Sequence, residues 1–272
     1  MPSSLSLSKP PLGGLITLTT DFGIADHFVG AMKGVILSIA PKARIVDISH
    51  QITPYNIAEA AFTIAQSWRY FPKGTIHVVV IDPGVGSARR PILVDAAGQY
   101  FIGPDNGVFS YIYEAAPARV REITNAKLRL REVSRTFHGR DIFAPASAHL
   151  ANKVAPARFG KLVKDPVRSP LLQPVHLKGS LWRGVVLKSD RFGNLITNFH
   201  VHQFPDIKTM PMELRIGRAR IRRLALTYTD VPPGDVFAVV GSSGFIEIAA
   251  NQASAADKLR CGAGAPVELE IE

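Results

Sequence analysis

Hydrophobic and polar residues follow two different patterns along the 272-residue chain. From residue 15 to about 153, short apolar or β-branched runs alternate with segments in which apolar residues recur at helical spacing. Residues 76–81 form a nearly continuous apolar run, which is typical of a central strand in a parallel sheet. Residues 28–39 and 57–68 place apolar side chains on one face of a helix. Further strand-like runs lie at 15–19, 45–48, 92–94 and 100–102, and a further helical pattern covers 142–150. The alternation predicts an α/β domain with a central, mostly parallel sheet over residues 15–165.

The last hundred or so residues show short strand-like runs separated by turn residues. These runs cover residues 184–187, 212–216, 220–226, 235–240, 245–248 and 266–271, and helical signal is confined to 253–259. They predict a smaller all-β, barrel-like domain over residues 180–272. Four prolines between residues 156 and 179 interrupt both patterns, and we expect a linker at 166–179. Residues 1–14 are rich in Ser and Pro and are expected to be a flexible lead-in.

Composition and charge narrow the class of protein. The hydrophobic fraction of 46% and the charged fraction of 20% are ordinary for a globular protein. The net charge of +10 would suit a nucleic-acid partner, but the basic residues are scattered and are not interleaved with aromatic residues. No apolar run approaches the ~20 residues that cross a bilayer, and the single cysteine, Cys261, cannot form an internal disulfide. We therefore expect a cytoplasmic protein that binds neither nucleic acid nor membrane.

Two candidate sites follow predicted strands of the α/β part, where parallel sheets bind their ligands. Asp21 follows the run at 15–19, and its carboxylate could accept hydrogen bonds from a ribose diol or cap the next helix. Asp82 follows the run at 76–81, and Gly84 and Gly86 let the backbone turn closely around a ligand before Arg89. Taken alone, the Asp-Pro-Gly segment indicates only a turn.

Further polar clusters lie at His138 and in the β part. A lone histidine is more often structural than catalytic, but His138 lies between Phe and Gly just ahead of a predicted helix. Residues 189–194 (Ser-Asp-Arg-Phe-Gly-Asn) and 241–245 (Gly-Ser-Ser-Gly-Phe) offer amides and hydroxyls, as does the later Asn251-Gln252 pair. The α/β part thus supplies carboxylates, an arginine and a histidine, and the β part mainly amide and hydroxyl groups.

Together, in this order and spacing, these segments resemble the S-adenosylmethionine (SAM) hydrolases, also called SAM hydroxide adenosyltransferases, which are related to fluorinases and chlorinases. The resemblance extends from about residue 16 to residue 259. It implies hydrolysis of SAM to adenosine and L-methionine without a cofactor. It also implies a homotrimer that binds SAM between the α/β domain of one subunit and the β domain of its neighbour. No metal is implied, and the chain has no HExxH or Cys/His ligand spacing.

The resemblance also implies roles for individual substrate-binding residues. Asp21 matches the carboxylate that holds the ribose hydroxyls, and Tyr55 matches an aromatic position that lines the pocket. Asn194 matches the amide that reads the adenine edge, with Phe192 beside it. The remaining candidates are Asp190 and Ser242 for the ammonium group, Ser243 for the carboxylate, where fluorinating members have Arg, and Gln252.

Asp82, Arg89 and His138 match the triad of the water-using branch of this family. The sulfonium already makes methionine a good leaving group from the ribose C5′, so the nucleophile is what catalysis must supply. Arg89 could stabilise the developing hydroxide while remaining charged. Asp82 could orient Arg89 or His138, and His138 could accept the proton.

Three other functions compete with hydrolysis. A halogenase of this fold would carry other residues at positions 82 and 138, and Gly139 replaces a hydroxyl residue that helps fluorinating members hold fluoride. A SAM-dependent methyltransferase would place its glycine loop after the first strand, whereas here it follows the third. A protein that only binds SAM or nucleic acid has no need of Asp, Arg and His converging on one point. Hydrolysis is therefore favoured.

Overall fold

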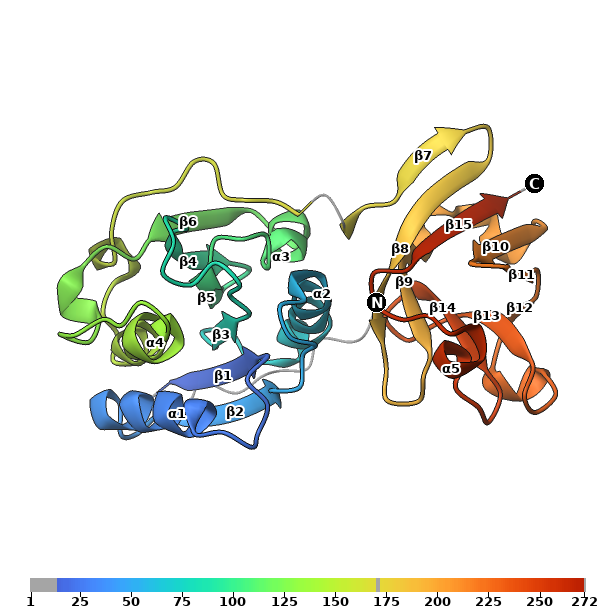
Figure 1. Cartoon of the computed structure of the whole chain (residues 1–272). Coiled ribbons are helices and arrows are strands. Elements are labelled where there is room, and N and C mark those ends of the chain that lie inside the picture. Colours follow the sequence, from blue (N-terminus) through green and yellow to red (C-terminus); the bar gives the residue numbers. More distant parts are fainter. Residues whose placement is uncertain (1–13, 170–171, 272) are drawn as a thin grey trace. The chain divides into compact units, whose positions relative to one another are not determined.

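The computed structural model describes residues 14–169 and 172–271, and the chain divides after residue 169 into two compact units (Figure 1). Each unit has its own sheet and its own apolar core. The lead-in expected at residues 1–14 lies, apart from Gly14, outside the described residues.

The first unit is built on a six-stranded sheet in the order β2-β1-β3-β5-β4-β6. Its strands are Leu15–Thr20 (β1), Arg44–Ser49 (β2), Ile76–Val80 (β3), Pro91–Ala96 (β4), Gln99–Pro104 (β5) and Ala118–Glu122 (β6). The first, second, third and fifth strands run parallel, whereas β4 is antiparallel to both of its neighbours. This mixed, mostly parallel sheet confirms the predicted α/β class.

Helices cover both faces of this sheet (Figure 1). They are Phe28–Ile39 (α1), Ile57–Ser67 (α2), Ser110–Ala115 (α3) and Ala144–Ala151 (α4). Successive residues of a strand point to opposite faces. Val78 accordingly packs in one core with Met32 of α1, and Val79 packs in the other with Ile64 of α2 and Ile112 of α3. Burial on both faces explains why the β3 sequence is apolar throughout.

The second unit is a largely antiparallel, curled sheet of nine strands in the order β11-β10-β15-β8-β9-β14-β13-β12, with β7 paired to β8. Its strands are Val175–Lys178 (β7), Leu181–Ser189 (β8), Leu195–His200 (β9), Met212–Ile216 (β10), Ala219–Ile221 (β11), Leu224–Ala225 (β12), Val236–Val240 (β13), Phe245–Ala250 (β14) and Pro266–Ile271 (β15). One short helix, Ala255–Leu259 (α5), follows β14. The smaller all-β, barrel-like domain predicted from the sequence is confirmed as a half-barrel of this kind.

Four elements differ from those expected. Residues 175–178 form β7 and pair with β8, so this end of the segment expected as a linker belongs to the second sheet. Strand β9 was not predicted because its centre is polar, although Thr197 and Asn198 are both buried. In the first unit, α3 and β6 were also missed, since a six-residue helix is too short to show a helical period.

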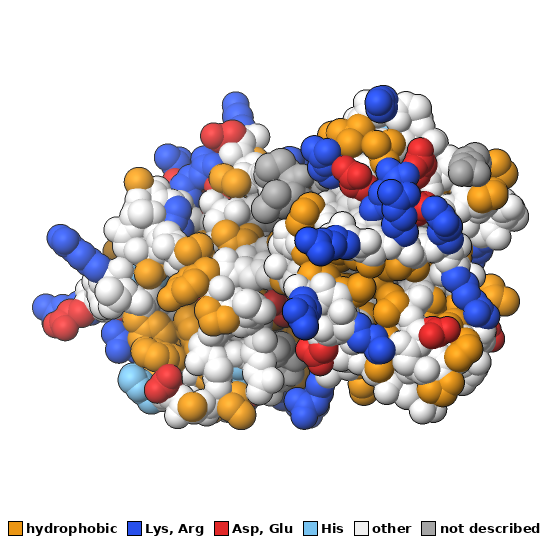
Figure 2. Space-filling view, turned by 45° about the vertical axis from the view of Figure 1, so that its right-hand side comes forward, with side chains coloured by type: hydrophobic (Ala, Val, Ile, Leu, Met, Phe, Trp, Pro, Cys, Tyr) orange, Lys and Arg blue, Asp and Glu red, His pale blue; other side chains and the backbone are white. Residues whose placement is uncertain are grey.

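Charged side chains on the visible face in Figure 2 are interspersed, with Asp and Glu among Lys and Arg. Glu213, for example, pairs with Arg215, Arg220 and Arg222. Such pairing is typical of a solvated surface. Within residues 14–169 and 172–271, every helix is too short or too polar to span a lipid bilayer.

Candidate active site

Two carboxylates of the first unit emerge at one edge of its sheet. Thr20, the last residue of β1, is in register with Val80, the last residue of β3. Asp21 and Asp82 therefore follow neighbouring parallel strands at their carboxyl ends, where open α/β sheets bind ligands. Burial raises the pKa of Asp21, and the negative charge of Asp82 adds a smaller effect in the same direction.

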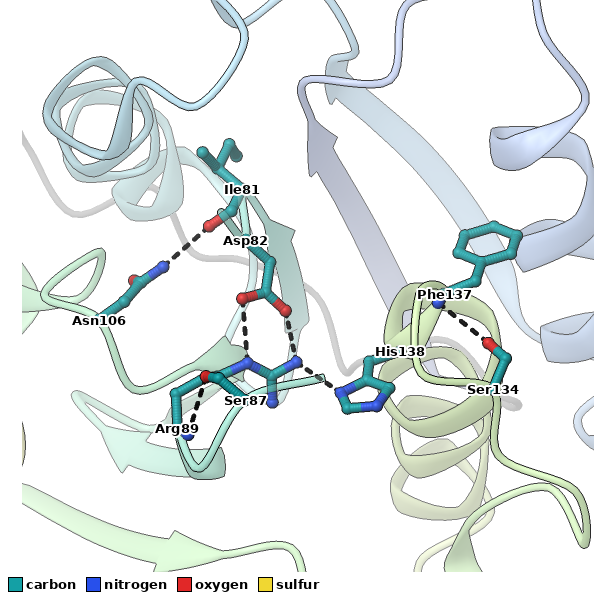
Figure 3. A network of polar contacts seen from close by, with 8 residues as sticks. All are labelled: Ile81, Asp82, Ser87, Arg89, Asn106, Ser134, Phe137 and His138. Atoms are coloured by element: carbon teal, nitrogen blue, oxygen red, sulfur yellow. Dashed lines mark hydrogen bonds and ion pairs between the residues drawn. The ribbon is translucent and has the colours of Figure 1, made fainter. Parts of the chain in front are cut away.

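The turn after Asp82 returns Arg89 to the Asp82 carboxylate (Figure 3). Val85 N–H donates to the Asp82 carbonyl at 3.1 Å, and Ser87 N–H donates to the Gly84 carbonyl at 3.1 Å. These two reverse turns place the Arg89 side chain so that Nε donates to Asp82 Oδ1 at 2.9 Å while Nη2 donates to Oδ2. Both side chains are buried, with 9% of Arg89 and 5% of Asp82 exposed. A buried two-point contact of this kind fixes the guanidinium plane.

The same Arg89 Nη2 also lies 2.6 Å from His138 Nδ1 (Figure 3). A guanidinium can only donate, so Nδ1 must be the acceptor and the proton of the neutral ring must be on Nε2. Burial, followed by the positive charge of Arg89, lowers the pKa of His138. His138 is thus held neutral, and its Nδ1 lone pair is already used. This geometry does not favour the expectation that His138 accepts a proton.

Hydrogen bonds to a buried carboxylate hold the loop that carries His138. Asp141 is fully buried and its Oδ2 accepts the Ser134 N–H at 2.8 Å, while Ser134 Oγ accepts the Phe137 N–H at 3.0 Å. Burial would raise the pKa of Asp141, but hydrogen bonds from Arg140 and Ser134 outweigh it and lower this pKa. A π-helical turn over Gly139–Phe143 then leads into α4, and such turns are frequent at functional sites.

Asp21 is tied to a second loop through Tyr55. The Tyr55 N–H donates to Asp21 Oδ2 at 2.9 Å, and Tyr55 has a left-handed backbone with φ of 66° and a side chain that is largely exposed. A left-handed backbone is costly for a bulky residue and recurs at binding sites. Helix α1 has His27 as its N-cap without a side-chain cap bond. The alternative that Asp21 caps this helix is therefore wrong.

These groups line one pocket of about 350 Å³ in the first unit. Asp21, Tyr55, Asp82 and His138 contribute the polar atoms, and the apolar walls include Phe22, Phe28 and Phe137. Gly139 also lines the pocket, and a Cβ at this position would already lie 3.2 Å from Met32 Sδ. The first unit thus places two carboxylates and a neutral histidine around a small, largely apolar space, and Arg89, outside the pocket lining, is bound to Asp82 and His138.

A larger pocket, of about 820 Å³, lies in the second unit. The structure brings together five of the six site residues expected there, namely Asp190, Phe192, Asn194, Ser242 and Gln252. Ser243 does not line this pocket. The turn after β8 is closed by the Asp190 side chain, whose Oδ1 accepts the N–H groups of Phe192 and Asn194 at 2.8 and 2.9 Å.

Two residues that line the second pocket, Tyr228 and Glu247, were missed from the sequence. Glu247 interrupts the apolar run of β14, and this single charge in a buried strand was the signal that could have revealed it. Tyr228 lies in a short helical turn between strands, where its side chain direction cannot be read from periodicity. Within the described residues, no three His, Cys, Asp or Glu side chains gather as they would around a metal ion.

Known proteins resemble this chain over most of its length. A family model described as the SAM hydroxide adenosyltransferase N-terminal domain matches residues 16–160, and the model of the C-terminal domain matches residues 184–268. An (R)-S-adenosyl-L-methionine hydrolase from Salinispora arenicola is 38% identical over 255 residues, covering 90% of this chain and 93% of that protein. A fluorinase from Actinoplanes is more distant, at 29% identity over 94% of this chain and 97% of its own length.

Among solved structures, an uncharacterized conserved protein from Thermotoga maritima matches with a TM-score of 0.85 and 34% identity. The match covers 93% of this chain and 99% of that one. Similarity therefore extends over both units, in sequence as well as in structure.

Proposed function

The chain belongs to the SAM hydroxide adenosyltransferase family and is a SAM hydrolase, and we propose that Asp82, Arg89 and His138 form its catalytic centre. It cleaves (R)-S-adenosyl-L-methionine to adenosine and L-methionine. The observation that carries the proposed centre is the guanidinium of Arg89, held by a buried carboxylate and a histidine lone pair. A cation fixed so firmly beside a pocket is suited to stabilise charge that develops during a reaction.

Water attacks the ribose C5′ and the C5′–S bond breaks, so that methionine leaves as a neutral thioether. Bulk water is a weak nucleophile with a pKa of about 15.7. Arg89 stabilises hydroxide character on the attacking oxygen and stays charged throughout. Positioning the attacking water in line with the breaking bond lowers the barrier further.

The proton of the attacking water needs an acceptor other than His138 Nδ1. Asp82 lines the pocket, and each of its oxygens has an acceptor site left beside the one that Arg89 occupies, so we assign this role to its carboxylate. His138 instead holds Arg89 in place by accepting its hydrogen bond. Arg89 thus contacts the reacting oxygen, and His138 is its positioning residue.

The substrate groups are assigned to residues by the pockets that they line. Asp21 holds the ribose hydroxyls, with Tyr55 beside it, in the pocket of the first unit. Asn194, Phe192 and Gln252 contact the adenine in the pocket of the second unit, and Asp190 and Ser242 lie at the methionine end. Ser243 lies outside the lining of this pocket, and its position gives no support to a role in binding the carboxylate.

The pH profile tests the role of His138. Since its neutral ring accepts from Arg89 and its pKa is lowered, kcat/KM should hold its plateau to below the ordinary histidine pKa of about 6.5. It should then fall as the pH drops through the lowered pKa, because a proton on Nδ1 would face the Arg89 N–H. Asp21, with a raised pKa, adds to the same acid limb.

His138→Asn separates the titration of His138 from that of Asp21. The side-chain oxygen of Asn can replace the acceptor at Nδ1 but cannot titrate. We expect this variant to retain activity within about tenfold of wild type and to keep only the acid limb of Asp21. His138→Ala should lose about 100-fold. An Asn variant as inactive as the Ala variant would instead support a proton-accepting role for His138.

We further propose that the enzyme is a homotrimer whose active sites combine the first-unit pocket of one subunit with the second-unit pocket of its neighbour. The support is that the catalytic centre and the larger pocket are built by different units.

A single cysteine, Cys261, supports a reducing, cytoplasmic setting.

Mixed trimers test the shared site. His138→Ala and Asp190→Ala, each of which should have little activity alone, are co-expressed with different affinity tags and purified through both. Every trimer that carries both tags has one of its three sites built from two intact units, so about a third of wild-type activity should return. Trimers of either variant alone are the controls, and no recovery in the mixed trimers would contradict the proposal.

The reaction itself is tested with (R)-S-adenosyl-L-methionine in ¹⁸O-labelled water, with and without chloride, and mass spectrometry of the products. Labelled adenosine plus methionine, unaffected by chloride, is the expected result. A 5′-halogenated adenosine would identify a halogenase, and intact substrate despite binding would identify a SAM-binding protein without turnover.

A further inference from the structure

Glu247 is a charged residue at the centre of a buried strand. It lies on β14, opposite Val239 of β13 and Ile196 of β9, and only 8% of it is exposed. Every other residue of β14 is apolar and buried. The part of Glu247 that remains accessible lines the second-unit pocket. A carboxylate at such a position is costly unless it has a partner.

The chain leaves space for this carboxylate at Gly241. A Cβ at position 241 would lie 1.8 Å from Glu247 Oε1, so any other residue there would displace the Glu247 side chain. Gly241 also lines the pocket and directly precedes Ser242. The absence of a side chain at Gly241 therefore lets Glu247 Oε1 lie close to the part of the pocket to which the methionine end has been assigned.

Within the described residues, the Glu247 side chain receives one hydrogen bond, from the Tyr228 hydroxyl to Oε2 at a long 3.4 Å. Its Oε1 receives none. Burial and the negative charge of Asp190 raise the pKa of Glu247, whereas the Tyr228 hydroxyl opposes this rise. A nearly buried carboxylate with one weak donor has most of its acceptor capacity left for a ligand.

The Asp190 carboxylate, unlike that of Glu247, already accepts several hydrogen bonds. Its Oδ1 accepts two backbone N–H groups, and its Oδ2 accepts Asn194 Nδ2 at 2.9 Å. Most of its acceptor sites are thus used to close its own turn. The described residues that line the pocket include these two carboxylates and no Lys, Arg or His. The pocket is anionic although the chain carries a net charge of +10, so it suits a cationic ligand group.

We propose that Glu247 binds the ammonium group of the substrate's methionine half directly, and that Asp190 contributes a second negative charge in the same pocket. The inference rests on the proposed function, since it takes SAM as the molecule in this pocket. It adds Glu247 as a substrate-binding residue to Asp190 and Ser242 at the methionine end. An ammonium group brings three donors, which supplies the partners that Glu247 lacks.

The test compares two substrates in two proteins. Glu247→Gln keeps the shape of the side chain and removes its charge, and the second substrate is the SAM analogue that lacks the α-amino group. Relative to wild type, the variant should raise KM for SAM by roughly 10- to 100-fold, with kcat within about threefold. For the deaminated analogue, wild type and variant should have the same KM, because the ammonium group is absent.

Glu268→Gln is the matched control, since Glu268 lies on β15, pairs with Arg183 and lies outside the pocket. It should leave both KM values unchanged. Thermal melting of all three proteins checks that the Gln variants are folded.

Two results would overturn the inference: an unchanged KM for SAM in Glu247→Gln, or an equal rise of KM for both substrates. Either is distinct from a failure of the proposed function, in which the wild-type enzyme itself would produce no labelled adenosine from SAM.

Discussion

Replacing Arg89 with lysine should lower kcat for SAM hydrolysis by about 100- to 1000-fold, with KM changed by less than about threefold. Lysine keeps the positive charge, but its single ammonium cannot occupy the three contact points that Arg89 makes with Asp82 Oδ1, Asp82 Oδ2 and His138 Nδ1. The charge would move relative to the attacking water. Since the water is aligned only in the transition state, the loss should appear in kcat.

Arg90→Lys is the matched control for this substitution. Arg90 is the next residue and also makes paired contacts, but its partners are Asp105 and Asp165, which do not line the pocket, whereas the Arg89 partners Asp82 and His138 do. Its kcat should remain within about twofold of wild type, because the contacts of Arg90 do not involve the residues that line the pocket. Steady-state kinetics on both variants checks the prediction. Equal kcat values for the two lysine variants would exclude Arg89 from the catalytic centre.

The fold was predictable where one physical cause dominates the sequence. Val78 and Val79 are apolar because both faces of β3 are covered by helices, and this double burial is directly visible as a continuous run. Strand β9 was not visible, because Thr197 and Asn198 are buried there with hydrogen bonds: the Thr197 hydroxyl donates to the Ile246 carbonyl, and Asn198 Oδ1 accepts the Val185 N–H. A polar residue satisfied in this way appears, in sequence, to belong to a turn.

The candidate site was predictable to a different degree in each unit. Asp21 and Asp82 could be placed together, because parallel neighbouring strands end at one edge. The direction of the hydrogen bond at His138 Nδ1 could not be predicted, because it depends on Arg89 approaching across 49 residues of sequence. Glu247 was missed for a similar reason: its buried, nearly unpartnered state depends on Gly241 and Tyr228, which lie on other elements.

At Gly86 the turn that follows Asp82 packs against the loop that carries His138. Gly86→Ala should therefore lower both the thermal stability and the activity. Its φ of 77° is left-handed, and a Cβ there would lie 2.3 Å from the Arg135 carbonyl oxygen in the loop that carries His138. Positive φ and the clash together should cost about 3 kcal/mol, which lowers the Tm of the first unit by about 10 °C. The Arg135 loop would have to move away, so the bond between Arg89 and His138 would lengthen and kcat should fall by about 100-fold.

Gly84→Ala separates this effect from a general sensitivity of the turn, because Gly84 lies two residues earlier in the same segment. A Cβ at Gly84 would lie 3.4 Å from Arg89 Cγ and from Ser87 Oγ, near ordinary contact distances, and its backbone is outside the left-handed region. Its Tm should therefore stay within about 2 °C of wild type. Calorimetry and kinetics on the two alanine variants decide the matter. If Gly86→Ala melts and turns over like Gly84→Ala, the close packing of the Asp82 turn on the His138 loop is not what holds Arg89 against His138.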